Sequence, residues 1–135
     1  MNVEVPSMFA KESYSDSTSN SFRYIDYYGT AGERCNLNIR LAHPSNKNAK
    51  DYLEYIIYIK PNDTYSGILE KEINDQKWYY ATIESKKESS FRYEYYYATI
   101  YQDYIYGVNF SISSTNEPIK CLKAHNTIEK SLKFK

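Results

Sequence analysis

A chain of 135 residues with 17 Lys and Arg against 17 Asp and Glu is long enough for one domain and has no net charge to attract nucleic acid or an anionic membrane. No stretch approaches the roughly 20 apolar residues of a transmembrane helix, and Met1–Pro6 lacks the charged and apolar regions of a signal peptide. We therefore expect a single domain over residues 1–135. It is either cytoplasmic, or exported with its signal removed, a case that leaves room for a lipid anchor upstream.

Tyrosine is unusually frequent, with 17 of the 135 residues. Asn, Ile and Lys are frequent too, and all four have AT-rich codons, so a bias in base composition explains the excess without a binding surface. Tyrosine is also a good strand former, and its abundance therefore favours a sheet.

The N-terminal third predicts a hairpin. After a polar loop over residues 11–20, Phe22–Tyr28 has the composition of a strand, and Gly29–Gly32 breaks it. In Arg34–Ala42 apolar and polar residues alternate, which is the pattern of a strand with one buried face. The apolar side holds Cys35, Leu37, Ile39 and Leu41, and the polar side holds Asn36, Asn38 and Arg40.

The next element is ambiguous. Several Ser and Asn residues before Ala49 are candidate helix N-caps, and apolar residues then recur at helical spacing. The run Tyr55–Ile59 is rich in β-forming residues and is compatible with a strand. We expect a helix over Ala49–Ile59, closed by Pro61.

Four strands and a second helix follow. Turn residues and period-two patterning predict strands at 68–73, 77–84, 91–101 and 105–112, joined as a meander. Pro118 suits the first turn of the helix, whose apolar stripe is Cys121, Ala124, Ile128 and Leu132. The sequence thus predicts an α+β fold, an antiparallel β-sheet of about six strands flanked by two helices. Its core should contain Leu37, Ile39, Val108, Phe110, Ile128 and Leu132.

Five segments appear in a characteristic order: the lead-in Val5–Phe9, the hairpin with its helix, Ile73–Trp78 before a strand, Tyr106–Phe110, and the closing Ile128–Phe134. This order resembles the PsbP-like superfamily, which includes extrinsic photosystem subunits, a Ran-binding import factor and uncharacterised bacterial proteins. The resemblance covers most of the chain and rests on hydrophobic patterns, not on catalytic residues. It implies an α-β-α sandwich and a non-catalytic, protein-binding role that is often extracytoplasmic.

The two cysteines, Cys35 and Cys121, each lie on the apolar face of their element. They are either separate buried thiols that pack as small hydrophobes, or one disulfide that ties the second strand to the last helix. A disulfide across so long a loop stabilises by roughly 4 kcal/mol in the chain-entropy model, and it fits an exported protein.

The sequence contains no motif for a catalytic, metal or cofactor site. His43 and His125 belong to no cluster with metal-ligand spacing, and the four glycines form no phosphate-binding loop. His125 and Cys121 are neighbours on the helix but lack a third orienting group. We expect no enzyme activity, no metal and no cofactor, although dispersed carboxylates of the glycosidase kind leave a small enzyme as a third alternative.

The best functional candidate is the aromatic side of the strand at 91–101. Alternation places Phe91, Tyr93 and Tyr95 on one face, with Arg92 and Glu94 on the other. If the helices leave the start of this strand uncovered, the three rings form a patch that binds a partner, since tyrosine anchors a partner at little entropic cost. The alternative is that the rings pack beneath the helices and keep their hydroxyls in water.

These observations favour an extracytoplasmic bacterial binding or accessory domain that acts by contact with a protein partner of unknown identity. The balanced charge argues against a nucleic-acid partner. A small cytoplasmic inhibitor or immunity-type protein is the alternative.

Overall fold

A computed structural model describes residues 1–12, 18–25, 32–42, 48–87 and 90–134. Its elements are β1 (Ala10–Lys11), β2 (Ser19–Ile25), β3 (Arg34–Ala42), α1 (Ala49–Ile56), β4 (Thr64–Tyr65), β5 (Leu69–Ile73), β6 (Gln76–Lys87), β7 (Ser90–Tyr101), β8 (Tyr104–Ser114) and α2 (Ile119–Ser131).

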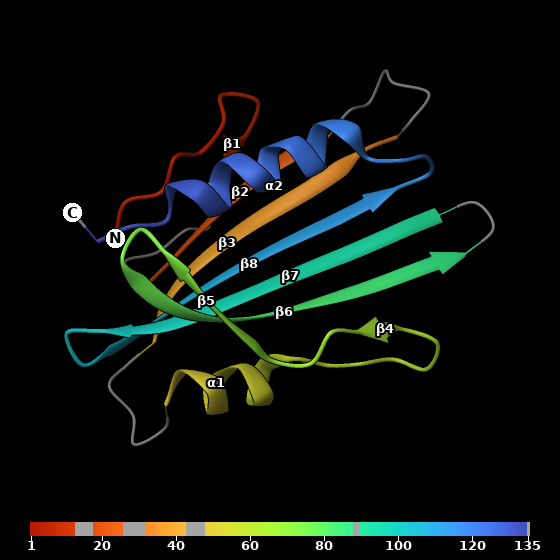
Figure 1. Ribbon diagram of the computed structural model, residues 1–135. Helices are drawn as coiled ribbons and strands as arrows, with labels where there is room; N and C mark the ends of the chain where they lie inside the picture. The colour runs from red at the N-terminus through yellow and green to blue at the C-terminus, as the bar shows by residue number, and fades with distance from the viewer. Residues whose placement is uncertain (13–17, 26–31, 43–47, 88–89, 135) are drawn as a thin grey trace.

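All the strands belong to one antiparallel sheet (Figure 1), in the order β1-β2-β3-β8-β7-β6-β4, with β5 also paired with β6. The structure confirms the α+β class and the antiparallel sheet flanked by two helices. In the described part of the chain the sheet has eight strands rather than about six. The additional strands, β1 and β4, are two-residue segments, too short for periodicity to reveal.

Two of the hairpins close through two-residue turns in the left-handed region. Asn74 and Asp75 join β5 to β6, and Gln102 and Asp103 join β7 to β8, with φ between 49° and 68°. This backbone conformation is typical of hairpin turns whose twist matches that of the flanking strands. The turns predicted at both positions are therefore confirmed.

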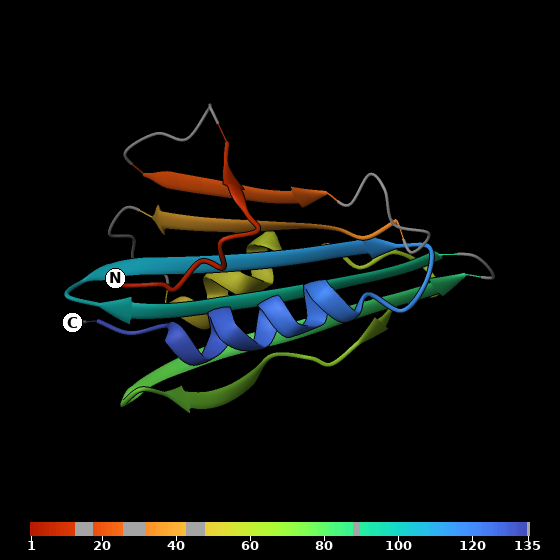
Figure 2. The ribbon, with the colours of Figure 1, turned by 90° about the horizontal axis from the view of Figure 1, so that it is seen from above.

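One face of the sheet is covered by α2 together with the N-terminal segment. Figure 2 shows α2 over the β6–β7 side of the sheet and the N-terminal segment crossing β8 and β3. Phe9 of that segment packs against the ring of Phe110, with centroids 6.1 Å apart. The main core lies between these layers: Cys35, Leu37, Ile73, Trp78, Tyr97, Val108, Phe110, Ile112, Cys121, Ala124, Ile128 and Leu132. The predicted core is confirmed, with Ile39 partly rather than fully buried.

A disulfide between Cys35 and Cys121 joins β3 to the first turn of α2. The two Cα atoms lie 6.0 Å apart across 86 residues of sequence. The buried carboxylate of Glu33 lies beside this bond and accepts a hydrogen bond from the Cys121 N–H at 3.0 Å. Since Pro118 provides no side-chain cap, Glu33 satisfies one of the unpaired N–H groups at this helix start and its charge complements the helix dipole.

The other face is covered by α1 (Figure 1), joined by Ile57 and Ile68 of the segment that follows it. Asn48 caps α1 by accepting a hydrogen bond from the Asp51 N–H at 2.8 Å. Ala49 and Leu53 form a second small core with Ala98 of β7.

The contact between α1 and β8 depends on a glycine. A Cβ at Gly107 would lie 3.0 Å from the ring of Tyr52, closer than packed atoms normally approach. Glycine at this position therefore lets Tyr52 lie directly on the β8 backbone.

The predicted end of the first helix is wrong by three residues. α1 ends at Ile56 rather than Ile59, and Ile57 already has extended backbone dihedrals. The β-branched and aromatic residues of this run lose side-chain freedom in a helix, and residues 57–60 are neither helix nor strand.

Strand pairing also extends beyond the predicted limits. β6 and β7 pair as far as Lys87 with Ser90, so most of the loop expected at 85–90 is strand. β2 begins at Ser19, within the expected loop, because it pairs along β3 as far as Arg40. Hydrogen bonding to a neighbouring strand outweighs local propensity at both places. The remainder of the first predicted strand, residues 26–28, lies outside the described residues.

Leu37 and Leu69 test the placement of the core. Leu37 is fully buried, whereas Leu69 on edge strand β5 is 43% exposed. We expect Leu37→Ala to lower the free energy of unfolding by about 2–5 kcal/mol because it leaves a cavity, and Leu69→Ala to lower it by less than about 1 kcal/mol. Urea unfolding of both variants measures this difference, and equal losses would contradict the assignment.

Candidate functional site

The two faces of the sheet differ in how completely they are covered. On the α2 side, β3 presents its apolar residues to the core. On the α1 side, strands β2, β3 and β8 and the start of β7 present polar residues, most of them exposed or half-buried. We call this surface the polar face: Ser21, Arg23, Asn36, Asn38, Arg40, Arg92, Glu94, Asn109, Ser111 and Ser113.

Three adjoining hollows run along the polar face. The one beside α1 has a volume of about 180 Å³ and is lined by Asn38, Arg40, Tyr52, Ile56, Tyr96, Gly107, Val108 and Asn109. The second, of about 380 Å³, shares Asn38 and Asn109 with the first. The third, of about 320 Å³, shares Asn36 and Ser111 with the second. The hollows thus form one continuous trough over the strands.

Side chains of the polar face are held in place by cross-strand partners. Ser21 donates to Asn38 Oδ1 at 2.9 Å, and Arg23 donates to Asn36 Oδ1 at 3.2 Å. Both pairs lie directly opposite each other in the β2–β3 register. Arg23 also forms an ion pair with Glu12 at 2.8 Å. The sheet therefore presents these amides and guanidinium groups at fixed spacing.

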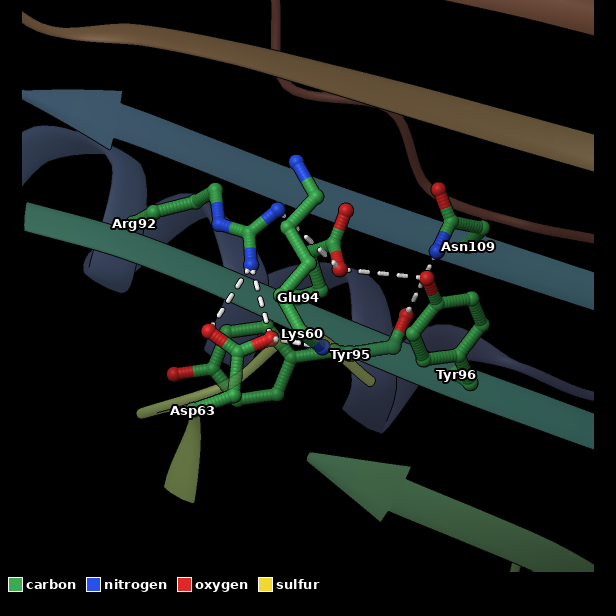
Figure 3. Close-up of polar contacts among 7 residues, drawn as sticks. All are labelled: Lys60, Asp63, Arg92, Glu94, Tyr95, Tyr96 and Asn109. Atoms are coloured by element: carbon green, nitrogen blue, oxygen red, sulfur yellow. Dashed lines mark hydrogen bonds and ion pairs between the residues drawn. The ribbon is translucent and has the colours of Figure 1, made fainter. Parts of the chain in front are cut away.

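Arg92 is the centre of a polar network where β7 meets the segment before β4 (Figure 3). Its Nη2 lies 3.1 and 3.0 Å from the two carboxylate oxygens of Asp63, and its Nη1 lies 4.0 Å from Glu94. The Lys60 N–H donates to Asp63 at 2.9 Å. This hydrogen bond is the main cause that lowers the pKa of Asp63, and Arg92 lowers it further. Asp63 is therefore ionised and fixes Arg92.

The same network positions Tyr96 at the edge of the first hollow. The Tyr96 hydroxyl donates to Glu94 at 3.2 Å, and Figure 3 shows Asn109 beside it on the neighbouring strand. Burial and the negative charge of Glu94 raise the pKa of Tyr96 to about 12. The hydroxyl is thus a hydrogen-bond donor at neutral pH.

A second polar cluster lies buried on the α2 side. The Tyr97 hydroxyl donates to Glu129 and lies 2.7 Å from His125 Nε2, and Lys71 forms an ion pair with Glu129 at 2.9 Å. Since a hydroxyl has one proton, the Nε2–H of His125 donates to the Tyr97 oxygen. The ring of Tyr95 stacks on His125 with centroids 3.7 Å apart and closes the cluster.

The pKa values of the cluster follow from burial and charge. Burial lowers the pKa of His125 to about 4, against a smaller opposing effect of Glu129. Burial would raise the pKa of Glu129, but hydrogen bonds from Tyr97 and Lys71 outweigh it and lower the pKa. Burial and Glu129 raise the pKa of Tyr97. At neutral pH the cluster therefore consists of a neutral imidazole, a neutral phenol and one ion pair.

The residues singled out in the sequence lie on the α2 side. Phe91, Tyr93 and Tyr95 are half-buried, and Tyr93 and Tyr95 pack against the main core. Their role in partner binding stays a prediction. Cys121 is bonded to Cys35 and is thus not a thiolate beside His125. His43 lies outside the described residues.

The polar face was not singled out from the sequence, although its signal is present. Asn36, Asn38 and Arg40 alternate with the apolar side of β3, and Asn109 and Ser111 do the same in β8. The pairing of Asp63 with Arg92 has no sequence signal, because 29 residues separate them.

Neither a metal site nor a membrane-spanning helix is evident in the described residues. They contain no group of three or more His, Cys, Asp or Glu side chains placed to hold a metal ion. Neither α1 nor α2 is long and apolar enough to cross a bilayer.

Comparisons with known proteins give a fold relationship. No protein-family model and no curated protein matches the sequence. The fold is similar to that of LpqN, whose crystal structure describes it as involved in cell envelope biogenesis of Mycobacterium tuberculosis. The TM-score is 0.62 at 10% sequence identity, over 96% of this chain and 80% of LpqN. At this identity the likeness shows a shared fold alone.

His125 makes the stability of the fold depend on pH. An unfolded histidine binds a proton below pH 6.5, whereas folded His125 does so only near pH 4. The unfolded state therefore gains protons as the pH falls through this window, and the folded state loses about 2 kcal/mol between pH 7 and pH 5. Urea unfolding at both pH values should show a smaller loss in His125→Gln, and identical losses in the two proteins would exclude His125 as the cause.

Proposed function

We propose that this chain is a non-catalytic accessory domain that works outside the cytoplasm and binds another protein through its polar face. The observation that carries the proposal is the half of the sheet that no helix covers. There, four adjacent strands offer amide, hydroxyl and guanidinium groups whose spacing is fixed by strand register. Directional groups of this kind supply specificity and register at protein interfaces.

Two features support a place outside the cytoplasm. A disulfide in the core is typical of proteins that fold in an oxidising compartment. The fold is shared with LpqN, a protein of cell envelope biogenesis. Because the net charge at neutral pH is zero, we expect the domain to recognise its partner by local complementarity of shape and charge, and not by a long-range electrostatic field.

Membership of the PsbP-like superfamily is part of the same proposal. The order of hairpin, helix, meander and closing helix agrees with the sequence resemblance. The implied role, contact with a protein partner without chemistry, also agrees with a sheet face that is open and polar.

The redox state of the cysteines tests the compartment. We expect protein isolated from its native compartment, denatured without reductant, to titrate with no free thiol, because the Cys35–Cys121 bond forms during folding in an oxidising environment. Treatment with reductant before denaturation is the control and should release both thiols. Two free thiols in the untreated sample would refute an extracytoplasmic location.

Photo-crosslinking tests the polar face. A benzophenone amino acid would replace Asn38, which is exposed on the polar face, or Asn126, which is exposed on α2. Irradiation of intact cells of the source organism should give one discrete adduct from position 38, because the partner covers that face, and none from position 126. Adducts of equal yield from both positions, or an adduct from position 126 alone, would place the partner elsewhere.

A further inference from the structure

The hollow of about 180 Å³ beside α1, which we call the Arg40 hollow, is lined by both apolar and polar side chains. Its apolar or aromatic groups come from Tyr52, Ile56 and Tyr96. Its polar groups come from Asn38, Arg40 and Asn109. A cavity of this kind, mostly apolar with a few convergent polar groups, is typical of a site that holds a single ligand group.

Arg40 differs from the other arginines near the centre of the polar face. Arg23 is paired with Glu12, and Arg92 is paired with Asp63 and Glu94. No carboxylate of the described residues forms an ion pair with Arg40, whose guanidinium contacts the Tyr52 hydroxyl instead. The hollow therefore has a positive charge that is not neutralised from within the described parts of the chain.

The other polar groups of the hollow add donors rather than acceptors. Asn38 Oδ1 already accepts a hydrogen bond from Ser21, which leaves its Nδ2 donors to a ligand. Asn109 lies 3.4 Å from the Tyr95 carbonyl through Nδ2 and also forms a side-chain hydrogen bond with Tyr96, so it offers a ligand less than Asn38 does. An arginine flanked by amide donors matches a carboxylate, because the guanidinium can hold both of its oxygens.

The apolar wall determines what accompanies the carboxylate. Tyr52 is held against β8 by its contact with Gly107, and Tyr96 is held by Glu94. These two rings are thus pre-positioned and lose little entropy on binding. They suit an apolar side chain next to the charged group.

We propose that the Arg40 hollow binds an acidic peptide segment, in which a Glu or Asp carboxylate meets Arg40 and a neighbouring apolar side chain packs on Tyr52 and Tyr96. This inference rests on the proposed function and names the partner's chemistry. Charge complementarity with an unpaired arginine selects the acidic residue. Arg34 also lines the trough, in the third hollow, but the Arg40 hollow is the one that adds the aromatic groups of Tyr52 and Tyr96.

Titration of the ¹⁵N-labelled protein with blocked peptides tests the inference. The probe is N-acetyl-Phe-Glu-Ala-amide, and the same peptide with Gln in place of Glu is its neutral counterpart. We expect the acidic peptide to shift the backbone amides of Asn38, Gly107 and Asn109 and to bind at least about ten-fold more tightly than the neutral one, since a hydrogen bond to a charged group is worth that much.

Arg40→Gln should abolish this preference for the acidic peptide. Arg34→Gln is the matched control, because Arg34 lies on the same strand, is exposed, and does not line the Arg40 hollow. Unchanged thermal midpoints would show that both variants are folded. Equal binding of the two peptides, no shift with either, or a preference that survives in Arg40→Gln would overturn the proposal.

Two further outcomes separate this inference from others. The same titration is repeated with D-glucuronate, a saccharide that carries a carboxylate. Binding of glucuronate as tight as that of the acidic peptide would overturn the assignment to a peptide. If position 38 crosslinks in cells while the peptides show no preference, the partner uses the polar face in another way. In that case only the inference about the Arg40 hollow fails.

Discussion

The docking of α2 on the sheet is the constraint on which the rest of the fold depends. The apolar stripe of α2 is buried in one core with residues of β3, β8, β7 and β6, so this core forms only when strands that are distant in sequence lie side by side. The Cys35–Cys121 bond holds one end of this contact, and Glu33 completes the hydrogen bonds of the helix start there. At the other end, the Asn74 side chain donates to the carbonyls of Lys130 and Leu132. The helix is thus tied at both ends to the sheet on which it packs.

The polar face is a consequence of the same docking. Because successive side chains of a strand point to opposite faces, burying Leu37 in the main core commits Asn36 and Asn38 to the other side. A slip of one residue between β3 and β8 would exchange the two sets, which the core does not tolerate. The stability of one face therefore enforces the exact spacing of groups on the other. Further along the sheet, β6 has apolar residues on both sides, and there α1 with Ile57 and Ile68 provides the second cover.

Patterning alone located β3 and β8, because each has one buried and one polar side. Patterning was less informative for β7, where Tyr95 and Tyr96 place aromatic rings on opposite faces of the strand. The sequence does not indicate which of the two rings is covered by a helix. The stacking of Tyr95 on His125 and the pairing of Arg92 with Asp63 depend on the strand order and on the path of residues 57–68. Both are long-range properties that no local propensity contains. The end of α1 was misplaced for a local reason, since helical spacing and β-forming residues compete at Tyr55–Ile59.

The two ends of the chain meet in a short bridge between Asn2 and Lys133, at one corner of the molecule (Figure 1). A mechanical pull on both ends would therefore open this bridge one hydrogen bond at a time, rather than shear a long ladder. The segments before Cys35 and after Cys121 would then lengthen, while the disulfide encloses everything between them. Most of the polar face, on β3, β7 and β8, lies inside that covalent loop. The tension would bypass this loop, but most of α2 follows Cys121, so a pull that opened the bridge would next strip this helix from the core.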